Sequence, residues 1–144
     1  MLNEYNVKAV NDTYKNAHIA MQSISDLLPD VKDAGLKKEL DSEFKGYETH
    51  INDISAFMKE NELEPKDINA FKKVIMKGSI KMKTMFDDSK NQIADMMLKG
   101  TTMGINELSQ MMNEKENLDE NVCTLVSDLL KTEENYEKRL RKYL

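Results

Sequence analysis

Apolar side chains recur at alternating spacings of three and four residues along most of the chain, which is the period of an α-helix with one buried face. The pattern predicts four long helices, at about 3–28, 33–63, 89–114 and 119–144. Pro29 and Pro65 lie just beyond the first two predicted helices, since proline cannot continue a helix. In the first helix the repeating positions are Val7, Val10, Tyr14, Ala17, Met21, Ile24 and Leu28.

The lengths of the connections predict how these helices are arranged. Short turns separate the first helix from the second and the third from the fourth, so each pair is expected to pack antiparallel. Residues 65–88 form a much longer connection, which we expect to be a partly helical crossover. The chain therefore predicts one all-α domain over residues 1–144, a four-helix bundle with a long crossover between helices two and three.

Composition narrows the class of protein. The net charge is −5, from 21 Lys and Arg against 26 Asp and Glu, which argues against general nucleic-acid binding because that activity needs a basic face. Cys123 is the single cysteine, so no intramolecular disulfide can form, as is typical of a reducing compartment. No apolar stretch approaches the about 20 residues of a membrane span. We expect a cytoplasmic protein.

Four sequence segments carry a resemblance to a known superfamily. They are YKNAHIAM in the first predicted helix, GYETHINDI in the second, QIADMMLKGTTMGINELSQMM in the third and LLKTEENYEKRLRKYL in the fourth. With these segments the chain resembles the ferritin-like superfamily, near the small rubrerythrin-related bundles of unknown function. The resemblance implies a ferritin-like bundle, and for the oxidases of that superfamily it would imply iron oxidation, peroxide reduction or iron storage.

Metal chemistry sets a stricter test of this resemblance. A carboxylate-bridged di-iron site takes a Glu from each of two helices and a Glu-x-x-His motif from each of the other two. Here Tyr47 stands three residues before His50, where such a motif needs Glu, and the fourth predicted helix contains no His. Glu43, His50 and Glu133 could still bind one iron or manganese ion, with His18 as a fourth ligand.

The same side chains also allow a simpler interpretation. Two Glu residues on apolar faces can pair with nearby His and Tyr groups in a buried polar network that binds nothing. No phosphate-binding Gly-rich loop, Cys-x-x-Cys motif or nucleophile elbow occurs in the sequence. We therefore predict a degenerate metal site with no resident cofactor and no catalytic residue, and we keep metal binding as the alternative.

Methionine is concentrated in one part of the chain, because eight of the 11 Met residues lie between positions 76 and 112. Flexible thioethers fill cores and also form adaptable binding surfaces. Gly100 and Gly104 add a smooth strip that another helix could approach. The predicted apolar face of this third helix consists of Ala94, Met97, Thr101, Ile105, Leu108 and Met112, broadened by Ile93, Met96, Met103 and Met111.

The predicted crossover contains a basic segment at 71–86, with five lysines and no acidic residue. It can pack along the acidic bundle of its own chain, or it can bind an acidic partner or a membrane surface. We predict a non-enzymatic interaction or structural protein that self-associates, as a dimer or larger, through its Met-rich helix. The alternatives are a metal-binding protein and a surface binder that uses Lys72, Lys73, Lys77, Lys81 and Lys83.

Overall fold

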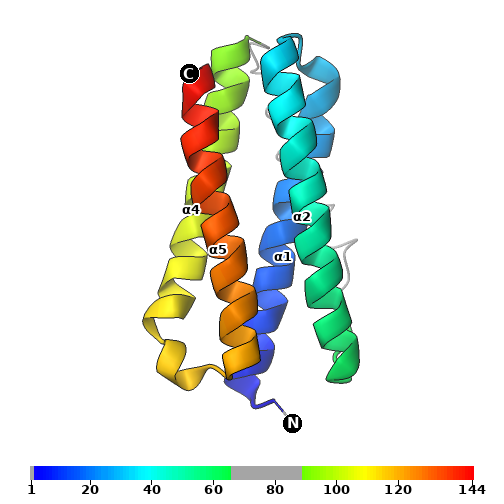
Figure 1. Ribbon diagram of the computed structural model, residues 1–144, viewed down its shortest axis with the longest axis vertical. Coiled ribbons are helices and arrows are strands. Elements are labelled where there is room, and N and C mark those ends of the chain that lie inside the picture. Colours follow the sequence, from blue (N-terminus) through cyan, green and yellow to red (C-terminus); the bar gives the residue numbers. More distant parts are fainter. Residues whose placement is uncertain (1, 66–88) are drawn as a thin grey trace.

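The computed structural model describes residues 2–65 and 89–144, and over these ranges it is all-helical (Figure 1). Four long helices are present: α1 (Glu4–Leu27), α2 (Ala34–Glu60), α4 (Lys90–Asn113) and α5 (Glu120–Leu140). Three short 3₁₀ turns accompany them: η1 (Leu28–Asp30), η2 (Lys115–Asn117) and η3 (Arg141–Tyr143). The predicted all-α bundle of four helices is confirmed. Residues 66–88 of the predicted crossover, including the basic segment, lie outside the described residues.

The helices pack as two antiparallel pairs, α1 with α2 and α4 with α5. Following the colours in Figure 1, α1 and α5 run in one direction and α2 and α4 run in the other. α1 also contacts both α4 and α5, so it packs against all three of the other helices. Side chains on α1 can therefore meet groups from every part of the bundle.

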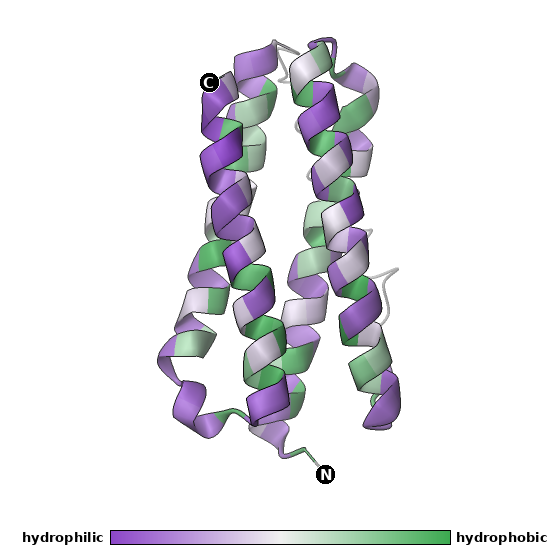
Figure 2. Ribbon diagram, in the orientation of Figure 1, coloured by the Kyte–Doolittle hydropathy of each residue, from purple (hydrophilic) through white to green (hydrophobic). Residues whose placement is uncertain are grey.

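The core forms where the apolar faces of the four helices meet, and most of the predicted positions are buried. Figure 2 shows hydrophobic and hydrophilic residues alternating along each of the four helices. Met103 is a clear exception, because it is 73% exposed although we predicted it on the apolar face. The buried face of α4 follows Met97, Thr101, Gly104 and Leu108, and Met103 lies about 100° around the helix from Gly104. In the described ranges, no helix combines the length and apolarity that crossing a membrane requires.

Local hydrogen bonds set where the second helix begins and ends. Asp33 caps the start of α2, as its carboxylate accepts from the Leu36 backbone N–H at 2.8 Å. The helix ends at Glu60 rather than at the predicted residue 63, because Glu62 takes a positive φ of 57°. The Leu63 N–H then bonds back to the Met58 carbonyl at 2.8 Å, a geometry that satisfies the last turn and stops the helix.

The fourth helix is also shorter than predicted. α5 ends at Leu140, and the last residues tighten into the 3₁₀ turn η3 instead of continuing as α-helix to position 144. The Tyr143 hydroxyl donates to the Gly35 carbonyl at 3.2 Å, which ties this turn to the start of α2. Tight final turns of this kind are common at helix ends, where the last carbonyls lack intrahelical partners.

Candidate functional site

Two carboxyl groups lie inside the core of the bundle. Glu43 on α2 is 0% exposed and Glu133 on α5 is 1% exposed. Helical spacing places them there, since Glu43 lies between the buried Leu40 and Tyr47, and Glu133 precedes the buried Tyr136 by three residues. We use the name polar centre for the cluster formed by Asn16, Glu43, Tyr47, Glu133 and Tyr136.

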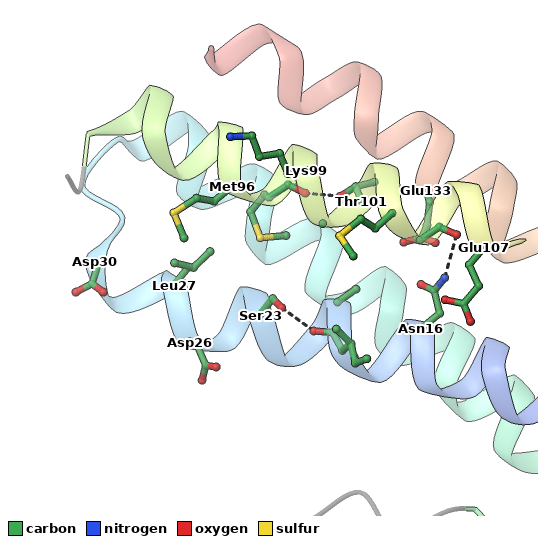
Figure 3. A pocket seen from close by; sticks show the side chains of 16 residues that line it. Asn16, Ser23, Asp26, Leu27, Asp30, Met96, Lys99, Thr101, Glu107 and Glu133 are labelled. Carbon is green, nitrogen blue, oxygen red and sulfur yellow. Dashed lines mark hydrogen bonds between the residues drawn. The ribbon is translucent and has the colours of Figure 1, made fainter. Parts of the chain in front are cut away.

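Hydrogen bonds and ring contacts in the polar centre connect all four helices. The Tyr47 hydroxyl of α2 donates to Glu133 Oε2 of α5 at 2.8 Å. The Tyr47 and Tyr136 rings meet edge to face, with centroids 5.4 Å apart. The Asn16 amide of α1 donates to the Gly104 carbonyl of α4 at 3.2 Å (Figure 3). The polar centre therefore spans the bundle at one level.

Burial changes the protonation of both carboxyl groups. It raises the pKa of Glu43 to about 10, with the nearby Glu39 carboxylate adding to the effect and Arg139 opposing it. Burial also raises the pKa of Glu133 to about 8, although the hydrogen bond from Tyr47 and the nearby Asn16 amide oppose this increase. Both groups are therefore largely protonated at neutral pH.

The added proton helps to explain the pairing of Glu43. Within residues 2–65 and 89–144, neither oxygen of Glu43 has a hydrogen-bond partner, and Glu39 Oε2 has none either. A protonated Glu43 can donate to Glu39, whose other oxygen accepts from Arg139 Nε at 2.9 Å. Glu133 Oε1 stays without a partner in the described part of the chain.

The four predicted metal ligands occupy different surroundings. Glu43 and Glu133 share the polar centre, where the charge of Glu133 contributes to the raised pKa of Glu43. His50 is half-buried and its Nε2 lies 2.8 Å from the Thr132 hydroxyl, and the His18 ring packs edge-on against Tyr14 at 4.4 Å. Among residues 2–65 and 89–144, no group of three or more His, Cys, Asp and Glu side chains is arranged to hold a metal ion. Metal binding by these four residues stays a prediction.

A groove between α1 and α4 leads to the polar centre. Its volume is about 410 Å³, and Glu133 of α5 lies at one end beside Asn16 and Glu107 (Figure 3). Most of the wall is apolar. The residues that line the groove are Asn16, Ile19, Ala20, Ser23, Asp26, Leu27, Asp30, Met96, Met97, Lys99, Gly100, Thr101, Met103, Gly104, Glu107 and Glu133.

The two glycines of α4 shape this groove in different ways. A Cβ atom at Gly104 would lie 2.8 and 2.9 Å from the Glu133 carboxyl oxygens and 3.0 Å from the Asn16 amide oxygen. A Cβ atom at Gly100 would meet no atom of the described residues within 4 Å. The strip predicted for a neighbouring helix therefore admits two polar side chains at Gly104, and at Gly100 none of the described residues contacts it.

Sequence reasoning missed Asn16 and the groove. Asn16 is only 7% exposed, but it falls beside the apolar positions Tyr14 and Ala17 and was not assigned to the core. A signal was present in the small residues Ala20, Gly100 and Gly104, which leave space when two helices pack. That signal indicates neither which helix faces them nor how large the space is.

No family model, curated protein or solved structure matches the chain.

Proposed function

We propose that the chain is a non-enzymatic, ferritin-like bundle that acts by binding, and that the groove between α1 and α4 is its binding site. The polar centre is then the remnant of a metal site, kept as a buried network. The observation that carries the proposal is an apolar groove of about 410 Å³ that ends on the buried Glu133. Small-molecule sites in proteins have about this size, apolar walls and a few polar groups that orient the ligand.

The substitution Gly100→Leu tests this function without disturbing the core. Its side chain would extend into the groove, since Gly100 lines the groove and no atom of the described residues lies within 4 Å of the new Cβ. It should reduce the affinity for the neutral dye Nile red at least tenfold, measured by fluorescence titration. Its free energy of unfolding should rise by up to about 1 kcal/mol, because Gly is a poor helix former.

Gly100→Ala is the matched control for this experiment. It should stabilise α4 by a similar amount, but a methyl group fills little of the groove, so dye affinity should change less than twofold. Equal affinities of the wild type, Gly100→Leu and Gly100→Ala for Nile red would contradict the proposal. Absence of Nile red binding by the wild-type protein would contradict it as well.

Self-association through α4 is a second candidate, favoured by the 73% exposure of Met103 at the edge of the groove. Exposed apolar side chains of this size often mark contact surfaces when they adjoin other apolar groups. Met103→Lys should weaken any dimer at least tenfold, because it places a charge in the interface. Sedimentation equilibrium would measure this change. At a protein concentration of about 100 μM even a weak dimer is detectable. A wild-type protein that stays monomeric at this concentration would exclude this candidate.

A further inference from the structure

The end of the groove presents an acceptor that no group of the described chain satisfies. Glu133 Oε2 accepts the hydrogen bond of Tyr47, while Oε1 has no partner. The residue is 1% exposed, so bulk water does not compensate for the missing bond. Buried polar atoms of this kind are rare in folded proteins, and each one calls for an explanation. Because Glu133 lines the groove, a ligand in the groove can supply the donor.

The charges that line the groove favour a positively charged ligand. Four of the charged residues in its wall are acidic, namely Asp26, Asp30, Glu107 and Glu133, and one is basic, Lys99. The Lys99 ammonium already lies 2.9 Å from the Asp95 carboxylate. Clefts lined by one sign of charge attract ligands of the opposite sign. In Figure 3, Glu107 reaches the same end of the groove as Glu133.

The remaining wall matches an extended apolar chain. Ile19 and Ala20 of α1 line the groove together with Met96 and Met97 of α4. The stretch of α4 from Met96 to Gly104 is about 12 Å long, at about 1.5 Å per helical residue. That distance is close to the length of a decyl chain. A ligand with a polar head at Glu133 could therefore place its whole tail against these side chains.

We propose that the groove binds a primary amine with an apolar tail, whose ammonium group donates to Glu133 Oε1 while the tail lies between α1 and α4. The ammonium offers three donors, one of which can also reach the Asn16 amide oxygen beside Glu133. A cation at this position stabilises the ionised carboxylate and so replaces the proton that Glu133 otherwise carries. This inference rests on the proposed function and adds the chemical class of the ligand.

Three probes of equal tail length test the head group: decylamine, decanol and decanoate. Each is titrated into the 144-residue chain at pH 8, below its micellar concentration, by displacement of Nile red and by calorimetry. Decylamine should bind about ten- to a hundredfold more tightly than decanol, as expected for one hydrogen bond to a charged group. Decanoate should bind more weakly than decanol. Equal binding of decanol and decylamine would overturn the amine assignment while leaving the groove as a binding site.

Two variants locate the head group. Glu133→Gln keeps the shape of the side chain and should reduce decylamine affinity to that of decanol, with decanol affinity unchanged. Glu107→Gln removes an exposed acid at the same end of the groove and should reduce the preference for the amine by no more than about threefold. An unchanged amine preference in both variants would overturn the proposal. Failure of all three probes to bind the wild type would instead reject the proposed function itself.

Discussion

Replacing Glu43 by Gln should stabilise the protein by about 5 kcal/mol at pH 8 and by less than about 1 kcal/mol at pH 5. The pKa of Glu43 is raised from 4.5 to about 10 by burial and by the Glu39 carboxylate. Gln has nearly the same shape, carries no charge at any pH, and its amide can donate to Glu39 as the protonated Glu43 does. The variant should therefore keep the packing of the core and lose the pH dependence.

The sign follows from the two pKa values of Glu43. Below pH 4.5 the group is protonated in both the folded and the unfolded protein, so burial then has no electrostatic penalty. As the pH rises towards 10, the unfolded chain releases the proton and the folded protein retains it. The free energy of unfolding then falls by up to about 1.4 kcal/mol per pH unit. Glu133, with a pKa raised to about 8, contributes in the same direction.

Urea unfolding at pH 5, 6, 7 and 8, followed by circular dichroism, measures this effect. The difference between Glu43→Gln and the wild type should grow steadily with pH. Glu48→Gln is the matched control, because it removes the same charge from an exposed position on α2 and should change stability by no more than about 0.5 kcal/mol at any pH. A constant difference between Glu43→Gln and the wild type would show that Glu43 is ionised in the folded protein.

The second large effect is expected at the contact between α2 and α5. Gly46→Ala should reduce the free energy of unfolding by about 2 kcal/mol, although Ala favours helix formation over Gly. A Cβ atom at this position would lie 1.8 Å from the Tyr136 hydroxyl oxygen and 3.2 Å from the ring carbon that carries it. The Tyr136 ring is 6% exposed and packs against Tyr47, so it has little room to move.

A second substitution at Tyr136 tests the cause of this loss. Tyr136→Phe removes the hydroxyl oxygen and leaves the ring carbon as the nearest atom, a contact that small shifts can relieve. In the double variant, Gly46→Ala should therefore cost at least about 1 kcal/mol less than it does in the wild type. Additive effects of the two substitutions in urea unfolding would show that the hydroxyl is not the obstacle.

The sequence was sufficient to predict the four helices and most of the core. Their apolar residues repeat at spacings that only a helix brings to one side, and Pro29 marks the first turn. The buried acids were also predictable, because Glu43 and Glu133 fall at positions where the helical period requires an inward side chain. The C-terminal end of α2 was harder to predict from the sequence. The residue with a positive φ there is Glu62, and no Gly at this position indicates that the helix stops.

The arrangement of the site depended on information that a linear pattern does not contain. The pairing of Arg139 with Glu39 joins residues 100 positions apart, and it depends on how α5 rotates against α2. The sequence likewise does not show that Nε2 of His50, a ligand in the metal-binding alternative, lies beside the Thr132 hydroxyl. A rotation of one helix by a few tens of degrees would exchange such partners without changing the apolar repeat. The groove volume depends on the same rotations.

The fit of Glu133 against Gly104 has a consequence for how this sequence can diverge. Both carboxyl oxygens lie within 3 Å of the place where a Cβ at position 104 would be, so the two positions cannot vary independently. In related chains that keep a carboxyl group at 133, position 104 should remain Gly. A larger residue should occur at 104 only where 133 has become smaller. Among the described residues nothing restricts position 100 in this way, so it should accept many side chains.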